Sequence, residues 1–83
     1  MKILEVTVNK KQYLDLLLLA DEQEDMIDRY LDKGRMYVID DNGIKCECVL
    51  TDEGNGVLEI KNISVLLKSL SNVVSTIISI LIF

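Results

Sequence analysis

Two turn signals divide the middle of the sequence and restrict how it can fold. Asn42-Gly43 lies between segments 35–40 and 44–51, and Gly54-Asn55-Gly56 separates 44–51 from 57–65. Asn-Gly favours a tight hairpin because both of its residues tolerate positive φ angles. The sequence therefore predicts a meander of three antiparallel strands over these segments.

Two short helices are predicted before the meander, after an alternating strand at 2–8. Asn9 and Gln12 have the spacing of a capping box, and apolar residues then recur at helical spacing. A second capping signal starts at Asp21, and Gly34 is expected to close that helix in a left-handed conformation. The apolar faces are predicted to consist of Tyr13, Leu16, Leu17 and Ala20, and of Met26, Ile27, Tyr30 and Leu31. We therefore expect an α+β fold with two helices packed on a small antiparallel sheet.

Length and charge restrict the classes of partner. At 83 residues the chain forms one domain at most, and a partner is expected to help bury its apolar surface. The net charge of −5 argues against nucleic acid, which requires a basic surface, and against an anionic membrane. The N-terminus lacks the long apolar core of a signal peptide. We expect a cytoplasmic protein that binds neither nucleic acid nor membranes.

The two cysteines lie in one predicted strand. Cys46 and Cys48 are two residues apart and so face the same side, about 7 Å from each other along the strand. This spacing is unfavourable for a mutual disulfide. The chain has no histidine or further cysteine to complete a soft metal site, so we expect no metal. Buried structural thiols are the main expectation, and an intermolecular or redox role is the alternative.

The last segment, 66–83, differs in composition from the rest, since Lys68 is its only charged residue. Its apolar residues recur at helical spacing, which predicts an amphipathic helix. Its many Val and Ile residues would equally suit a strand, and both structures stay open. A transmembrane anchor is a third possibility, but the uncharged run is shorter than the roughly 20 residues that a span requires.

The order of one strand, two helices and three antiparallel strands resembles the N-terminal half of the GNAT family of acetyl-CoA-dependent N-acetyltransferases. The resemblance covers residues 1–65, and its most telling parts are MYVIDDNG at 36–43 and LEIKNISV at 58–65. It implies a truncated acyl-CoA N-acyltransferase-like fold. Residues 1–65 would form the N-terminal half of a GNAT-like domain, and 66–83 an apolar helix or strand that departs from the family pattern.

The resemblance also implies roles for the strand at 57–65. Glu59 matches a position where several family members carry a glutamate that acts as general base on the acceptor ammonium. The backbone N–H groups of Ile63 and Val65 would polarise the acetyl carbonyl and pair with the pantetheine arm of acetyl-CoA. An exposed strand glutamate without a catalytic role is the alternative for Glu59.

The phosphate-binding pattern of the family does not follow that strand. Family members carry Gln/Arg-x-x-Gly-x-Gly/Ala there, and the amides at the start of the next helix cradle the pyrophosphate. The last glycine of this chain is Gly56, and Lys68 alone could contact a phosphate. We therefore expect a truncated N-acetyltransferase that is inactive alone, by natural loss or by a frameshift after residue 65.

A non-catalytic interaction module is the competing function. The strand at 57–65 would keep one unpaired edge, and such edges pair with other chains. The apolar tail would also need a partner to cover it. These two features predict a homodimer, while the tail alone supports a membrane-tethered peptide.

Overall fold

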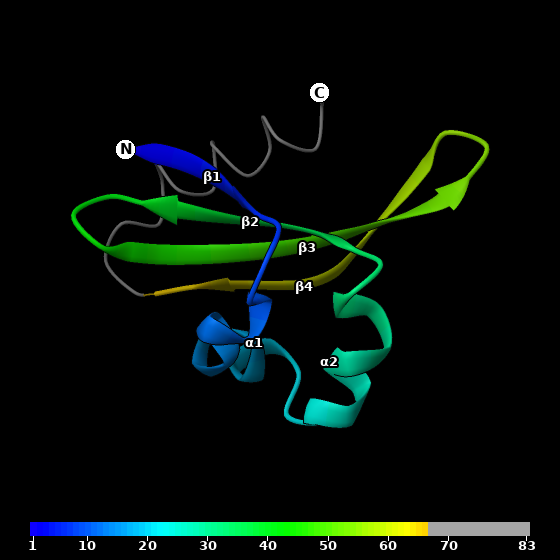
Figure 1. Ribbon diagram of the computed structural model, residues 1–83, viewed down its shortest axis with the longest axis horizontal. Helices are drawn as coiled ribbons and strands as arrows, with labels where there is room; N and C mark the ends of the chain where they lie inside the picture. The colour runs from blue at the N-terminus through cyan, green and yellow to red at the C-terminus, as the bar shows by residue number, and fades with distance from the viewer. Residues whose placement is uncertain (67–83) are drawn as a thin grey trace.

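The computed structural model describes residues 1–66, in which two helices lie on one face of an antiparallel sheet (Figure 1). The sheet has the order β1-β2-β3-β4, so each strand pairs with its neighbour in sequence. The elements are β1 (Lys2–Val6), the 3-10 turn η1 (Lys10–Tyr13), α1 (Leu14–Ala20), α2 (Glu24–Leu31), β2 (Arg35–Asp40), β3 (Ile44–Gly54) and β4 (Val57–Val65). The predicted α+β fold, with two helices on a small antiparallel sheet, is confirmed.

Both predicted turns have the expected backbone conformation. Asn42 and Gly43 have φ angles of 55° and 112°, and Asn55 has a φ of 55° between two glycines that also have positive φ. Strand β3 runs three residues beyond its predicted end, because pairing with β4 continues as far as Gly54 opposite Val57. The β3–β4 hairpin therefore projects beyond the rest of the sheet (Figure 1).

The starts of both helices differ from the capping boxes that the sequence predicts. Asn9 has a left-handed φ of 50° and its side chain makes no cap hydrogen bond, so its backbone turns the chain into η1 instead. Asp21 lies three residues before α2, where its Oδ1 accepts a hydrogen bond from the Gln23 N–H over 3.2 Å. Each residue thus shapes the loop before a helix, because Asn and Asp side chains favour turns as well as caps.

Gly34 was predicted to end α2 with a left-handed conformation, and this prediction is wrong. Its φ is not among the positive values of this part of the chain. Glycine is required there for space, because a Cβ atom would lie 2.8 Å from both the Tyr30 carbonyl oxygen and Val49 Cγ1. The backbone after α2 therefore passes in close contact with β3.

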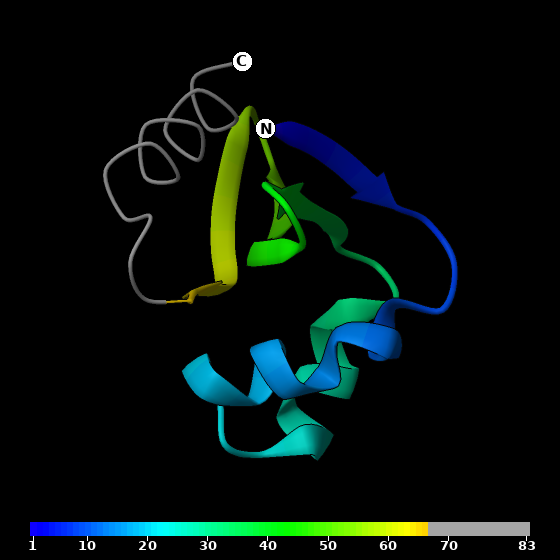
Figure 2. The same cartoon turned by 90° about the vertical axis from the view of Figure 1, so that its left-hand side faces the viewer.

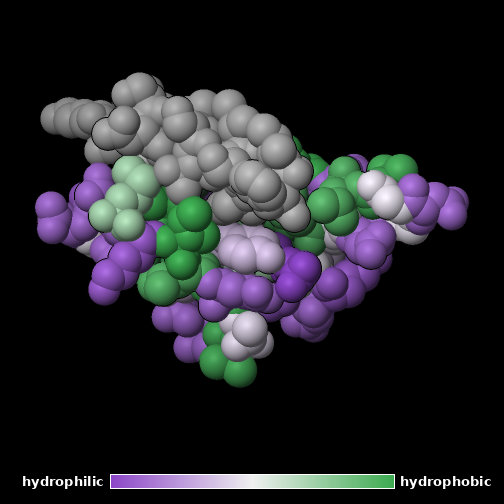
Figure 3. Space-filling view, turned by 90° about the horizontal axis from the view of Figure 1, so that it is seen from above, coloured by the Kyte–Doolittle hydropathy of each residue, from purple (hydrophilic) through white to green (hydrophobic). Residues whose placement is uncertain are grey.

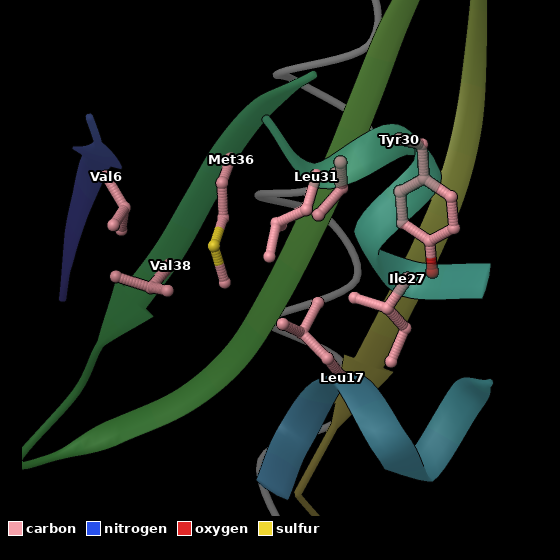
Figure 4. Close-up of a cluster of buried hydrophobic side chains, with 8 residues drawn as sticks. Val6, Leu17, Ile27, Tyr30, Leu31, Met36 and Val38 are labelled. Carbon is pink, nitrogen blue, oxygen red and sulfur yellow. The ribbon is translucent and has the colours of Figure 1, made fainter. Parts of the chain in front are cut away.

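The core lies between the helices and one face of the sheet (Figures 2 and 4). Leu17 of α1 and Ile27 of α2 point toward the sheet, and both are fully buried. Met26 is 37% exposed, so the predicted apolar face of α2 is narrower than its sequence suggests. The cluster consists of Val6, Leu17, Ile27, Tyr30, Leu31, Met36, Val38 and Val49.

Side chains on the other face of the sheet are buried as well. Ile39, Cys46 and Cys48 are at most 2% exposed, and the half-buried Val65 packs against the first two. Both cysteines are free, as buried structural thiols would be. Burial is the main cause that raises the pKa of Cys46 to about 12 and that of Cys48 to about 11. These thiols are poor nucleophiles at neutral pH, because the reactive form is the thiolate.

The predictions for segment 67–83, whether helix, strand or membrane anchor, lie outside the described residues. The domain boundary after residue 65 also stays a prediction, although the Leu66 N–H continues the ladder by donating to the Lys45 carbonyl over 2.7 Å. Within residues 1–66, neither helix has the length and the apolar character that crossing a membrane would require.

Candidate functional site on strand β4

Strand β4 carries the three residues to which the family resemblance assigns a role, Glu59, Ile63 and Val65, and its pairing with β3 is irregular at its centre. Val49 lies opposite Asn62, but the next residue of β3, Leu50, lies opposite Ile60. The register therefore steps over Lys61, as in a β-bulge, which bends a strand and redirects its side chains. The bulge separates Glu59 on one side from Ile63 and Val65 on the other.

One edge of β4 is open among the described residues, since β4 is the last strand of the sheet. Backbone N–H groups along a strand point alternately to its two edges. The Leu66 N–H points to β3, where it donates to Lys45. The N–H groups of Ile63 and Val65 must therefore point to the open edge, where no strand of residues 1–66 pairs with them. The structure thus brings together the two backbone donors that the sequence predicts.

Glu59 lies on the other side of the bulge, opposite Thr51 of β3. Its side chain is about half exposed, and its Oε2 lies 3.0 Å from the Lys61 Nζ in an ion pair. This bond is the main cause of a raised pKa at Lys61. A cationic acceptor would have to compete with Lys61 for the carboxylate. The geometry is compatible with a general base and equally with a structural ion pair, so the role of Glu59 stays a prediction.

Asn62, which the sequence analysis did not single out, attaches β4 to both helices. Its Nδ2 donates to the Leu17 carbonyl of α1 over 3.0 Å and to the Tyr30 hydroxyl of α2 over 2.9 Å. Asn62 is 3% exposed and directly follows the bulge residue Lys61. A polar residue in a strand between Lys and Ile was the available signal, because buried amides need partners. Asn62 thereby holds the bulged part of β4 on the helices.

A buried carboxyl group lies next to this attachment. Glu47 of β3 is fully buried opposite Ser64 of β4, and no described residue makes a hydrogen bond of standard geometry with either carboxylate oxygen. Burial raises the pKa of Glu47 to about 7, against a smaller lowering by the nearby Ser64 hydroxyl. Glu47 therefore loses its charge more readily than an exposed glutamate. Sequence reasoning missed it, because a Glu between two Cys in a strand gives no sign of which face is covered.

No cluster of three or more potential metal-ligating side chains occurs among residues 1–66. One feature that this part of the chain offers a ligand is the open edge of β4. Two outward N–H groups two residues apart match the amide groups of an extended chain such as a pantetheine arm. The residues present thus fit the arm of acetyl-CoA.

Comparison of the chain with known proteins identifies two similar solved structures. No protein-family model matches the sequence, and no curated protein matches it. A solved structure of a GNAT family acetyltransferase from Elizabethkingia anophelis with acetyl-CoA bound is 32% identical to the chain, with a TM-score of 0.82 over 98% of it. The chain has the fold of the N-terminal half of GNAT family acetyltransferases.

A second acetyltransferase structure has the same fold. It is an IAA acetyltransferase from Bacillus cereus ATCC 14579, 26% identical, with a TM-score of 0.73 over 94% of this chain. The chain spans about half the length of each neighbour, 54% of the first and 53% of the second. The family resemblance and the GNAT-like α+β fold predicted from the sequence are therefore confirmed.

Proposed function

We propose that this chain is the acetyl-CoA-binding half of an N-acetyltransferase and that it is inactive by itself. The observation that carries the proposal is the open edge of β4, with outward N–H groups at Ile63 and Val65. The same fold in the Elizabethkingia anophelis neighbour has acetyl-CoA bound. Acetyl-CoA is thus the substrate that the edge would hold, by backbone hydrogen bonds to its amide arm and its acetyl carbonyl.

Glu59 is the proposed general base. Its exposed carboxylate could accept a proton from an acceptor amine after release from Lys61, leaving the neutral amine as nucleophile. The acetyl group would then pass from sulfur to nitrogen, with free CoA as leaving group. The acetyl group at the edge of β4 and the base that activates the amine would then lie on the same strand.

The expected inactivity depends on the phosphates. No glycine follows Gly56, so residues 57–83 do not encode a glycine-rich loop that could cradle a pyrophosphate. Two parts of acetyl-CoA would therefore contribute differently to the affinity. The amide arm would be bound by β4, and the nucleotide would add little affinity.

Isothermal titration calorimetry with acetyl-pantetheine and acetyl-CoA tests this separation. We expect dissociation constants that agree within about threefold, since the two ligands share the arm and differ in the phosphates. Acetyl-CoA binding that is tighter by about tenfold or more would contradict the missing cradle. No heat from either ligand at about 10 mM would contradict binding by β4.

Val65→Pro is the matched variant for the edge. Proline removes the outward N–H but leaves the neighbouring bonds to β3, and edge strands tolerate it. We expect weaker binding of both ligands with an unchanged circular dichroism spectrum. Unchanged affinity in a folded Val65→Pro variant would contradict the proposal. Acetylation of an amine panel by the wild type, lost in Glu59→Gln, would support the base and contradict the inactivity.

A homodimer through β4 is the second candidate. The same open edge could pair with β4 of another copy, and four exposed apolar residues lie along this strand: Val57, Leu58, Ile60 and Ile63. Light scattering after gel filtration tests it, and a monomer of 9.4 kDa would contradict it. If the dimer and acetyl-CoA use the same edge, acetyl-pantetheine should dissociate the dimer.

A further inference from the structure

A hollow of about 270 Å³ lies on the sheet face opposite α1 and α2. Arg35 and Tyr37, which line it, alternate along β2 with core residues that face the helices. Leu50 of β3 is paired with Arg35, and Leu58 of β4 is paired with Asp52. The hollow, here called the Arg35 pocket, therefore spans three strands and is bordered by Lys33, Arg35, Tyr37, Leu50, Asp52 and Leu58.

The Arg35 pocket is lined by apolar as well as charged side chains. Leu50 is 5% exposed and Tyr37 is half-buried, whereas Leu58 is 53% exposed. Figure 3 looks onto this face and shows hydrophobic side chains at the projecting end of the β3–β4 hairpin, next to hydrophilic ones. The volume is just below the range of about 300–1,000 Å³ that is usual for drug-sized ligands, so a small molecule would fit.

The charged groups of the pocket favour an anion. In the described part of the chain Arg35 has one ion pair, and it is long, 3.7 Å from Arg35 Nε to Glu5 Oε2. The Arg35 side chain is 71% exposed. Lys33 forms no ion pair among these residues. It adds only a minor part to the lowered pKa of Glu53, which the Thr51 hydroxyl mainly causes.

The Asp52 carboxylate would repel an anion, but one of its oxygens already accepts a hydrogen bond. Its Oδ1 accepts a hydrogen bond from the Gly54 N–H over 2.9 Å. Among the residues that line the pocket, two cations therefore face one partly engaged carboxylate, while Glu5 and Glu53 act on these cations from outside the lining. A guanidinium group also matches the planar geometry of a carboxylate, because it can donate two parallel N–H bonds.

We propose that the Arg35 pocket binds small carboxylates with an apolar body, of the arylalkyl type. The carboxylate would lie against Arg35 and Lys33, and the apolar body against Tyr37, Leu50 and Leu58. This site is separate from the proposed acetyl-CoA site. Glu59 follows Leu58 in β4, so its side chain points to the opposite face of the sheet.

Titration of the 83-residue chain with phenylacetate, followed by two-dimensional amide NMR, tests the proposal. We expect saturable shifts that centre on the amides of residues 33, 35, 50 and 58. Phenylacetamide, which has the same shape without the charge, and phenethylammonium, which has the opposite charge, should shift these amides far less. Equal responses to phenylacetate and phenylacetamide, or no response to phenylacetate, would overturn the proposal.

Four variants test how the charged and the apolar residues contribute to phenylacetate binding. Arg35→Gln should weaken phenylacetate binding by about fivefold, the upper range for an exposed ion pair, and Lys2→Gln on β1 should leave it unchanged. Asp52→Asn should strengthen binding, because it removes the opposing charge and keeps the Oδ1 that Gly54 requires. Leu58→Ala should weaken binding of phenylacetate but not of acetate. Unchanged affinity in Arg35→Gln, with the spectrum of a folded protein, would contradict the site.

Discussion

Asn62 on strand β4 donates a hydrogen bond to the hydroxyl of Tyr30 on helix α2, over 2.9 Å in a buried environment. The Tyr30 hydroxyl lies in turn 3.4 Å from Asp21 Oδ2. Strand, helix and interhelical loop are thus joined through one hydroxyl group. Because buried polar groups are costly to leave unpaired, this contact couples the helices to the strand that carries the candidate site.

Asn62→Ala is expected to lower the free energy of unfolding by about 2–3 kcal/mol, since it removes two buried hydrogen bonds and leaves a small cavity. Urea denaturation measures this change. In a double-mutant cycle with Tyr30→Phe, the two losses should sum to more than the loss in the double variant, because both remove the same bond. Strictly additive losses would show that the contact does not couple the two elements.

Glu47 should make stability depend on pH. Its pKa is raised from 4.5 to about 7 in the folded state, so the folded protein binds a proton that the unfolded chain has released in this range. Stability therefore falls as the pH rises from about 4.5 to about 7, and the loss is complete above it. We expect Glu47→Gln to be more stable than the wild type by on the order of 3 kcal/mol at pH 8 and by little at pH 4.

Chemical denaturation of both proteins from pH 4 to pH 8 measures this difference. Glu22→Gln, at an exposed position, serves as the control and should show no comparable trend. A difference between Glu47→Gln and the wild type that stays constant across this range would refute the buried, readily protonated carboxyl group.

Gly34→Ala tests whether close packing is the reason for glycine after α2. The new Cβ would lie 2.8 Å from a backbone oxygen of α2 and from a side chain of β3, so we expect a loss of about 1–3 kcal/mol. Gly56→Ala is the matched control, since its Cβ would meet no atom within 4 Å but its φ is 77°. Asparagine, which tolerates positive φ, should restore stability at 56 but not at 34.

The two thiols should resist modification in the native state. Burial is the first cause of the pKa values of about 12 at Cys46 and about 11 at Cys48, so little thiolate is present at pH 8. We expect Ellman's reagent to react with neither cysteine until urea unfolds the chain, and then with both. Rapid reaction of one thiol in native buffer would mean that this face of the sheet opens.

Most of the secondary structure could be predicted because it depends on local chemistry. The Asn-Gly turn and the alternation of the strands are visible in short windows, and β2 and β4 have the predicted bounds, Arg35–Asp40 and Val57–Val65. The capping boxes predicted at Asn9 and Asp21 are absent, because local chemistry does not choose between two structures at these residues. Their side chains are as suited to a turn as to a cap, and only the path of the chain decides between the two.

The candidate site was predicted in part. The sequence places Glu59, Ile63 and Val65 on one strand, and the resemblance suggests their roles. It does not reveal that the register steps over Lys61, because a bulge depends on how the partner strand is paired. It also does not reveal that Asn62 contacts both helices, since its partners lie 32 and 45 residues away.

The sequence by itself determined the order of the elements, the two hairpins and the absence of glycine after Gly56, since each of these follows from residues close together in the chain. The tertiary structure alone decided which N–H groups of β4 point to the edge that residues 1–66 leave unpaired, which carboxyl group is buried, and why Gly34 must be glycine. Those properties depend on contacts between segments distant in sequence, where burial and strand register are set by neighbours that no local pattern specifies.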